Sequence, residues 1–194
     1  MPCQHHRAMD SPRRLSYDEL AAHRKETDRA FGSKRHPIAA LLWNVRSAYN
    51  VGSIFRTCDA IRAEKLLLCG FTPTPERHGI HKTALGAQQS VPWQYYPSVH
   101  EAIAEQRQRG HRILAVELAH GARPHWMVDA RDLPATFVFG NELVGISEEI
   151  LALCDDVLVI PMFGQKHSLN VAVSVGVVLY RTLEVIEQQG CVEH

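Results

Sequence analysis

The sequence predicts an α/β fold in which a mostly parallel sheet is flanked by helices. From Ile38 onward, short runs rich in Val, Ile and Leu alternate with segments of helical pattern, which is typical of a parallel sheet covered on both faces. The chain has 194 residues, of which 45% are apolar, and this suffices for one domain with a sizeable core. No internal repeat or low-complexity segment interrupts the pattern.

The first part of the chain is expected to be a helical, basic extension. Ser16 and Glu19 have the spacing of a capping box, which predicts a helix that ends at Gly32. The alternation of strands and helices begins only after this helix. We therefore expect residues 1–36 to form the extension and residues 37–194 to form the main domain.

Five apolar runs of the main domain have the length and β-branched content of buried strands, and a sixth run also fits a strand. In chain order, the expected strands are residues 38–45, 66–69, 91–95, 111–117, 136–139 and 157–160.

Four helices are expected between and after these strands, at residues 51–61, 99–109, 147–153 and 169–188. The second has Ser98 and Glu101 at its start and Gly110 at its end, which are helix start and stop signals. The last is rich in valine and its period alone also fits a strand, but its length favours a helix. Its first half is apolar nearly all round, so we expect burial on several sides. A subunit interface and burial within one chain both account for this pattern.

Charge and cysteine content limit the partners and the compartment. The formal net charge is +0, but residues 1–130 carry 18 Lys and Arg against 12 Asp and Glu, and residues 131–194 carry 3 against 9. A positive N-terminal portion suits phosphates, and a solvated surface of mixed sign is the alternative. Five scattered cysteines without a C-x-x-C pair indicate reduced thiols in the cytosol.

Neither a membrane span nor a secretory signal is expected. The longest apolar run, near residues 168–180, is too short and too polar at its ends to cross a bilayer. Residues 1–14 have no apolar core behind their basic residues. We therefore expect a cytoplasmic protein.

Several common ligand sites of α/β enzymes are excluded by the absence of their motifs. The sequence has no G-x-G-x-x-G, no G-x-x-x-x-G-K-[ST] and no G-x-S-x-G. His78 and His81 are the only histidine pair with metal-ligand spacing, but they are expected to lie in a Pro-rich loop without accompanying carboxylates or cysteines. No metal is expected.

Three polar segments lie where predicted strands end, which is where α/β sheets bind ligands. The first, residues 44–57, contains Asn50 and Arg56 at the start of a helix. In the alternative reading, Asn50 only caps this helix and Arg56 pairs with Asp59.

In the second segment, residues 137–147, Gly140 ends a strand and allows a ligand to approach closely. In the third, residues 159–173, Ser168 opens the last helix, whose free N–H groups suit a ligand. A plain strand–helix connection and an ordinary helix cap at Ser168 are the respective alternatives.

The three segments together resemble a known family. N-x-R-x-x-x-N-x-G-x-x-x-R-T, F-G-N-E-x-x-G-[IV]-S and I-P-M-x-G-x-x-x-S-L-N-V occur in this order and are similar to the three motifs of SpoU/TrmH-type RNA 2′-O-ribose methyltransferases, of the SPOUT superfamily. The resemblance covers about residues 38–180. It implies S-adenosylmethionine-dependent methylation of structured RNA, a homodimer, and a C-terminal trefoil knot, which the periodicity of the sequence does not show.

The resemblance also implies site residues. Carried over by motif, the catalytic group is Arg56, Asn50, Glu142, Ser168 and Asn170, and the residues expected to contact S-adenosyl-L-methionine are Gly140, Ile160, Met162, Ser168 and Leu169. The resemblance also implies that Glu117 and Leu118, at the end of another strand, help to hold the adenine side of the cofactor. A guanidinium is essentially never deprotonated in proteins. We therefore expect Arg56 to clamp a phosphate and stabilise the developing alkoxide rather than to act as a base.

RNA contacts are expected at Arg46 and Lys82 and on the basic extension at Lys34 and Arg35. Such contacts position the backbone without reading sequence. We favour tRNA over rRNA as the substrate. The alternatives are a catalytically silent RNA-binding protein on the same fold, a base-nitrogen methyltransferase of a related knotted type, and a small-molecule α/β enzyme, which no motif supports.

Overall fold

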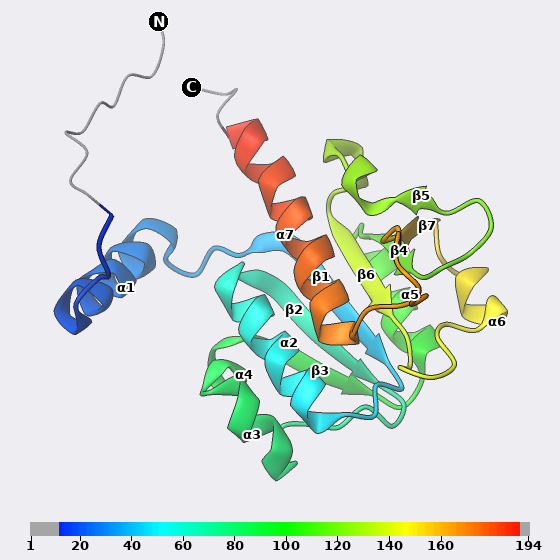
Figure 1. Ribbon diagram of the computed structural model, residues 1–194, viewed down its shortest axis with the longest axis horizontal. Helices are drawn as coiled ribbons and strands as arrows, with labels where there is room; N and C mark the ends of the chain where they lie inside the picture. The colour runs from blue at the N-terminus through cyan, green and yellow to red at the C-terminus, as the bar shows by residue number, and fades with distance from the viewer. Residues whose placement is uncertain (1–11, 191–194) are drawn as a thin grey trace, which may run out of the picture. The chain divides into compact units, whose positions relative to one another are not determined.

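The computed structural model describes residues 12–190, and these divide into two compact units (Figure 1). The first unit ends at Arg35 and the second begins at His36, one residue before the expected start of the main domain. Cys3 and Cys191 lie outside the described residues, whereas Cys58, Cys69 and Cys154 carry free thiols.

The first unit consists of α1 (Tyr17–Phe31) and its flanking residues. The Ser16 hydroxyl accepts a hydrogen bond of 3.3 Å from the backbone N–H of Glu19, and the Glu19 carboxylate accepts one of 2.7 Å from the N–H of Ser16. This capping box and the positive φ of 54° at Gly32 begin and end the helix where the sequence predicted. No residue of α1 is buried.

The second unit is built on a seven-stranded sheet of order β3-β2-β1-β6-β4-β7-β5, in which every adjacent pair is parallel. Leu42 of β1 lies opposite Leu68 of β2 on one side and opposite Phe139 of β6 on the other. The strands are β1 (His36–Trp43), β2 (Ala63–Cys69), β3 (Trp93–Tyr96), β4 (Arg112–Val116), β5 (Arg123–Pro124), β6 (Ala135–Phe139) and β7 (Asp156–Val159). All six expected strands are present, and the two-residue β5 was not predicted.

The four expected helices are α2 (Ala48–Ala60), α5 (Val99–Gln108), α6 (Glu148–Leu151) and α7 (Val171–Gly190). Two further short helices, α3 (His78–Ala84) and α4 (Ala87–Ser90), and two 3-10 turns, η1 (His125–Met127) and η2 (Ala130–Asp132), were not predicted. The reading of the segment around His78 as a Pro-rich loop was therefore wrong. Helix α3 lacks a side-chain cap, so its stability comes from tertiary packing, with Ile80 and Ala84 buried against α2.

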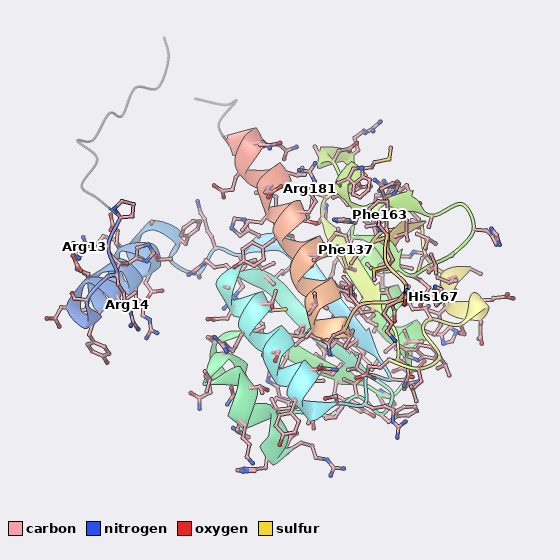
Figure 2. All side chains as sticks on the ribbon, viewed as in Figure 1. Arg13, Arg14, Phe137, Phe163, His167 and Arg181 are labelled. Atoms are coloured by element: carbon pink, nitrogen blue, oxygen red, sulfur yellow. The ribbon has the colours of Figure 1, made fainter. Side chains whose placement is uncertain are left out.

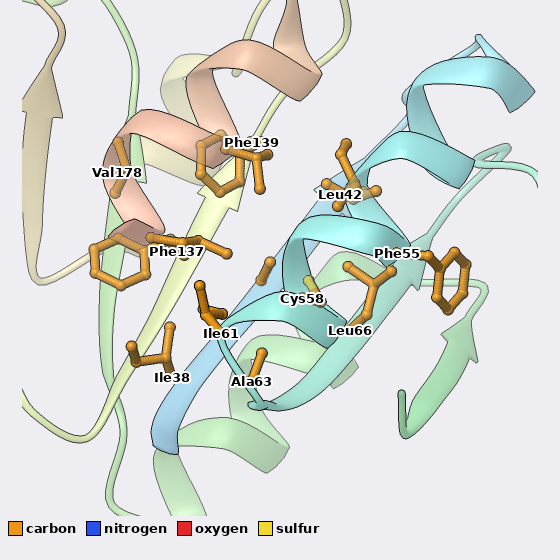
Figure 3. Close-up of a cluster of buried hydrophobic side chains, with 14 of the residues drawn as sticks. Ile38, Leu42, Phe55, Cys58, Ile61, Ala63, Leu66, Phe137, Phe139 and Val178 are labelled. Atoms are coloured by element: carbon orange, nitrogen blue, oxygen red, sulfur yellow. The ribbon is translucent and has the colours of Figure 1, made fainter. Parts of the chain in front are cut away.

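The helices form layers on both faces of the sheet. Figure 1 shows α2 and α7 crossing one face, and α5 and α6 pack on the other. Alternate residues of β1 feed the two cores: Ala40 and Leu42 pack with α2 and α7, whereas Ala39 and Leu41 pack with α5 and α6. Figure 3 shows the first core, where Phe137 and Phe139 lie near Val178 of α7.

Helix α7 is less buried than its composition suggested. Val175, Val178 and Leu179 are buried, but Val173 is 51% exposed and Tyr180 is 49% exposed. Burial within one chain, one of the two alternatives, therefore does not account for this stretch, because α2, the sheet and the two 3-10 turns leave part of the helix surface uncovered. An apolar stripe on α7 is left open.

Among residues 12–190, no helix combines the length and apolar content needed to cross a membrane.

Candidate functional site

The carboxyl ends of the four central strands β1, β6, β4 and β7 carry the candidate site. The chain from β1 proceeds to β2 and β3 on one side of the sheet, whereas β6, β4, β7 and β5 lie on the other. The order reverses between β1 and β6, and a crevice at such a switch point is where open α/β sheets bind ligands. The predicted polar segments follow β1, β6 and β7, so the fold brings all three to this edge.

A chain of hydrogen bonds joins one residue from each segment. The Asn170 Nδ2 donates to Asn50 Oδ1 at 3.1 Å, and the Asn50 Nδ2 donates to Glu142 Oε1 at 3.0 Å. Three of the five predicted catalytic residues are therefore in direct contact. Because the Asn50 amide is held at both ends, its orientation is fixed by its neighbours.

The Glu142 carboxylate is held by the loop that follows β1. It accepts hydrogen bonds from the backbone N–H of Arg46 at 3.0 Å and of Ser47 at 3.2 Å, in addition to the Asn50 amide. Partial burial raises the pKa of Glu142, but these hydrogen bonds together lower it by more. The net effect holds the pKa below its usual value. Glu142 is therefore ionised at neutral pH.

The helix caps differ from the predicted ones. The Ser47 hydroxyl accepts the N–H of Asn50 at 3.3 Å, so Ser47 caps α2 and the alternative in which Asn50 is the cap is wrong. At α7, the Asn170 Oδ1 accepts the N–H of Ala172 at 2.9 Å, so the cap expected at Ser168 lies two residues later. At α2 the capping residue Ser47 lies three positions before the site residue Asn50, whereas at α7 Asn170 both caps the helix and reaches into the site.

Arg56 is exposed on α2, and its guanidinium has no ion pair or hydrogen bond with any residue in the described part of the chain. The alternative pairing with Asp59 is not formed, and Asp59 instead accepts a hydrogen bond from the Ser90 hydroxyl. Arg56 lies six residues after Asn50, roughly 9 Å along the helix axis at 1.5 Å per residue. The structure does not connect it to the Asn170–Asn50–Glu142 chain.

All seven predicted cofactor residues line one cavity of about 310 Å³ at this edge: Glu117, Leu118, Gly140, Ile160, Met162, Ser168 and Leu169. His167 also lines the cavity and lies, with Phe163, on the loop between β7 and α7 (Figure 2). Glu142 belongs to the lining as well, so the hydrogen-bonded chain adjoins the cavity. The lining combines two carboxylates and other polar groups with apolar side chains.

The loop after β6 is packed too tightly for side chains at its glycines. A Cβ on Gly140 would lie 2.5 Å from the carbonyl carbon of Gly145. Gly145 has φ +65°, and a Cβ there would collide with the Glu117 carboxylate. That carboxylate accepts the N–H of Ile146 at 2.9 Å and of Leu118 at 2.9 Å. Backbone therefore forms part of the cavity wall.

Comparison with known proteins decides the family. The sequence profile of the SpoU rRNA Methylase family matches residues 37–180. The chain belongs to this family. The match confirms the resemblance drawn from the three motifs.

Individual SpoU relatives extend over most of the chain. A tRNA (guanosine(18)-2′-O)-methyltransferase of Thermus thermophilus is 34% identical over 166 residues, which cover 84% of this chain and 82% of the relative. The crystal structure of the Aquifex aeolicus TrmH/SpoU tRNA modifying enzyme aligns with a TM-score of 0.76 and 28% identity, over 88% of this chain and 86% of that one. The SpoU methyltransferase AviRb from Streptomyces viridochromogenes in complex with AdoMet aligns with a TM-score of 0.68 and 27% identity, over 78% and 58%.

Two asparagines that received no role from the SpoU motifs hold the site together. The buried Asn141 donates to the carbonyl of Asn44 at 2.8 Å and accepts the N–H of Leu143 at 2.8 Å. Asn44 has φ 57°, a conformation that asparagine tolerates better than most residues, and it accepts the N–H of Phe71 at 3.1 Å. The sequence signal that could have identified them is their place in the motifs: Asn44 directly follows a strand, and Asn141 directly follows Gly140.

The predicted RNA contacts fall in both units. Arg46 and Lys82 are exposed in the second unit, on the loop before α2 and on α3, whereas Lys34 and Arg35 belong to the first unit. His81 makes a side-chain contact of 3.0 Å with Gln88, and residues 12–190 hold no cluster of three potential metal ligands.

Proposed function

We propose that this protein transfers a methyl group from S-adenosyl-L-methionine to a ribose 2′-hydroxyl of tRNA. The observation that carries the proposal is the Asn170–Asn50–Glu142 chain, which joins the three SpoU motifs beside the cavity lined by the predicted cofactor residues. Family membership and the names of its relatives support the reaction. The Thermus relative makes guanosine 18 of tRNA the first nucleotide to test.

The cavity fits the cofactor in size and chemistry. Its volume of about 310 Å³ lies at the lower end of small-ligand pockets, and walls of Leu118, Ile160 and Leu169 suit an adenine ring. Glu117 and Glu142 give it negative character, which suits a sulfonium cation. When bound there, S-adenosylmethionine would supply an activated methyl group.

Glu142 acts in this proposal as a positioning residue rather than as a base. Its low pKa makes it a weak proton acceptor, and its oxygens already accept hydrogen bonds from two backbone N–H groups and from Asn50. It fixes the Asn50 amide, which with Asn170 orients the ribose. Arg56 is free to bind an RNA phosphate and to stabilise negative charge as it develops on the 2′-oxygen.

A homodimer through the open stripe of α7 is part of the proposal. Val173 and Tyr180 are exposed, and a Cβ on Gly176 would meet no atom within 4 Å. These positions recur every three or four residues, so they share one side of the helix. An uncovered apolar stripe of this kind is suited to a second copy of the chain, as the resemblance implied.

The cytoplasm is the proposed compartment.

The basic extension, with Lys34 and Arg35, is proposed to add RNA contacts. Phosphate contacts release counterions, so RNA affinity should fall steeply as the salt concentration rises. A flat dependence would argue against phosphate contacts.

Mass spectrometry of nucleosides tests the reaction. Unmodified tRNA and rRNA are incubated separately with the protein and methyl-labelled S-adenosylmethionine, then digested. A labelled 2′-O-methylguanosine from tRNA is expected. Label in a base instead of the ribose would replace the proposal with a base methyltransferase. Absence of both label and calorimetric cofactor binding would favour a silent RNA-binding protein.

A further inference from the structure

A second hollow lies beside the candidate site and shares no lining residue with the cofactor cavity. This aromatic groove measures about 750 Å³, and its wall includes Arg46, Phe71, Arg77, Trp93 and Tyr95. It is formed where the loops after β1 and β2 meet β3. None of the SpoU motif residues to which a catalytic or cofactor role was assigned lines it.

Arg46 connects the groove to the candidate site. Its backbone N–H donates to Glu142, and the residue also lines the groove. Ala48, in the first turn of α2 and two residues before Asn50, lines the groove as well. A ligand in the groove would therefore contact residues that precede Asn50 by only two and four positions in the chain.

The floor of the groove is rigid. The Thr72 hydroxyl is buried, accepts the N–H of Val45 at 3.1 Å, and lies within hydrogen-bond distance of the carbonyl of Cys69 at 2.8 Å. The Phe71 N–H is held by Asn44, and the Tyr95 hydroxyl donates to the carbonyl of Gly70 at 2.8 Å. A preformed surface loses little conformational entropy when a ligand binds.

The chemistry of the groove matches an unpaired nucleotide. Phe71 is 66% exposed and Tyr95 is 42% exposed, so flat apolar rings face solvent beside two arginines. The Arg46 and Arg77 side chains have no ion pair or hydrogen bond with other residues of the described chain. Aromatic rings stack on unpaired bases, and guanidinium groups bind phosphates or stack in turn.

The groove also carries one carboxylate, Glu76, whose pKa is lowered mainly by a hydrogen bond with Thr74. An ionised carboxylate repels a continuous track of phosphates but accepts hydrogen bonds from the amino and imino groups of a base. This charge arrangement favours a single nucleotide over the backbone of a duplex.

We propose that the aromatic groove binds one unpaired nucleotide of the RNA substrate, with its base against Phe71 and its phosphate on Arg77. The inference rests on the proposed function, because it supplies a second RNA contact next to the methylated ribose. It makes the groove a subsite that selects RNA with an unpaired neighbour.

The test compares Phe71→Leu, which removes the ring, with Phe71→Tyr, which keeps it. The probes are unmodified tRNA transcripts, with RNA affinity measured by filter binding and methyl transfer measured separately. Phe71→Leu should weaken RNA binding and raise the KM for RNA, roughly 5- to 150-fold, as for the loss of one stacked base. Phe71→Tyr should keep the wild-type RNA affinity and the wild-type KM for RNA. The affinity for S-adenosylmethionine, measured by calorimetry, should be the same in both variants. Because the side chain is exposed, neither variant should unfold.

Arg77→Gln tests the phosphate contact. The control is Arg131→Gln, which removes an exposed guanidinium outside the groove. Arg77→Gln should reduce the salt dependence of RNA binding by about one unit of log–log slope, and Phe71→Leu should leave the slope unchanged. Ultraviolet crosslinks to tRNA should map to the peptide containing Phe71 or Tyr95.

Wild-type RNA affinity and KM in both Phe71→Leu and Arg77→Gln would overturn the inference while the methyltransferase proposal stands. Loss of binding that Phe71→Tyr does not restore would also exclude stacking. A wild-type protein that neither binds nor methylates tRNA would overturn the proposed function, and the inference with it.

Discussion

The Asn50 amide donates a hydrogen bond of 3.0 Å to the Glu142 carboxylate, although 92 residues separate them in the sequence. This bond crosses the switch point of the sheet, from the first turn of α2, the helix after β1, to the loop after β6. The other side of the same amide receives Asn170 from the end of the loop that leads into α7. Asn50, in the first motif, is therefore hydrogen-bonded to a residue of each of the other two motifs.

Replacing Asn50 by Asp should slow methyl transfer at saturating RNA and cofactor. The new carboxylate would face Glu142 and could not donate to it, which removes a hydrogen bond to a charged group. Such bonds contribute about 1.5–3 kcal/mol, so single-turnover rates should fall roughly 10- to 150-fold. Calorimetric cofactor affinity should change far less, and an unaltered rate would show that Asn50 does not position the substrate.

The stabilising effect of Glu142 should depend on pH. Its pKa is lowered from an ordinary 4.5 in the folded chain, so the ionised group stabilises the fold above pH 4.5. This contribution is lost as the pH falls from 4.5 through the lower folded-state pKa. Urea unfolding of wild type and Glu142→Gln should differ by less than about 1 kcal/mol at pH 7, since the side chain is exposed. A difference that grows on acidification would contradict the assignment.

Gly145→Ala should weaken cofactor binding and destabilise the fold. Its positive φ costs a non-glycine residue about 1–2 kcal/mol, and the added Cβ would displace Glu117 from the cavity wall. Calorimetry with S-adenosylmethionine and thermal unfolding measure the two effects. Gly121→Ala is the matched control, because Gly121 also has a positive φ, of +78°, but its Cβ would meet no atom within 4 Å. Equal cofactor affinities in the two variants would disprove a role for the Gly145 backbone.

Much of this architecture could be predicted because strand and helix periods are local properties of the sequence. Residues 136–139 form a buried apolar run, and the structure has β6 at Ala135–Phe139. Helices α3 and α4 could not be predicted in this way, because they are short and depend on contacts with α2. The two-residue β5 depends likewise on its pairing with β7.

The candidate site, too, could be predicted only in part from the sequence. Five of the residues predicted to contact the cofactor come from the motifs and two, Glu117 and Leu118, come from the end of β4, and the segments after β4, β6 and β7 bring all seven to one cavity. The aromatic groove could not be predicted, because Phe71 and Tyr95 come from segments without a motif and meet only through the pairing of β2 with β3. Whether Ser47 or Asn50 capped α2 depended on where the helix began, which periodicity fixes only to within a few residues.

Val173→Asp should separate a homodimer into monomers. The side chain is exposed in the single chain, so the monomer would tolerate the charge, whereas an apolar interface would bury it unpaired. Sedimentation velocity should show a dimer for wild type and a monomer for the variant. Glu184→Asp, a conservative change in the same helix, should leave the dimer intact. A monomeric wild-type protein would refute the proposed assembly.

Arg56 provides the sharpest test of the chemistry, because its role is separable from folding. The guanidinium has no partner among residues 12–190, so Arg56→Ala should change the free energy of unfolding by no more than about 0.5 kcal/mol. Methyl transfer should nevertheless fall about 100-fold or more, as for the loss of a charge-stabilising donor. Arg56→Lys should fall as far if two parallel hydrogen bonds to a phosphate are required, since an ammonium group cannot form them. Single-turnover kinetics with saturating tRNA measure both variants, and full activity in Arg56→Ala would remove Arg56 from the mechanism.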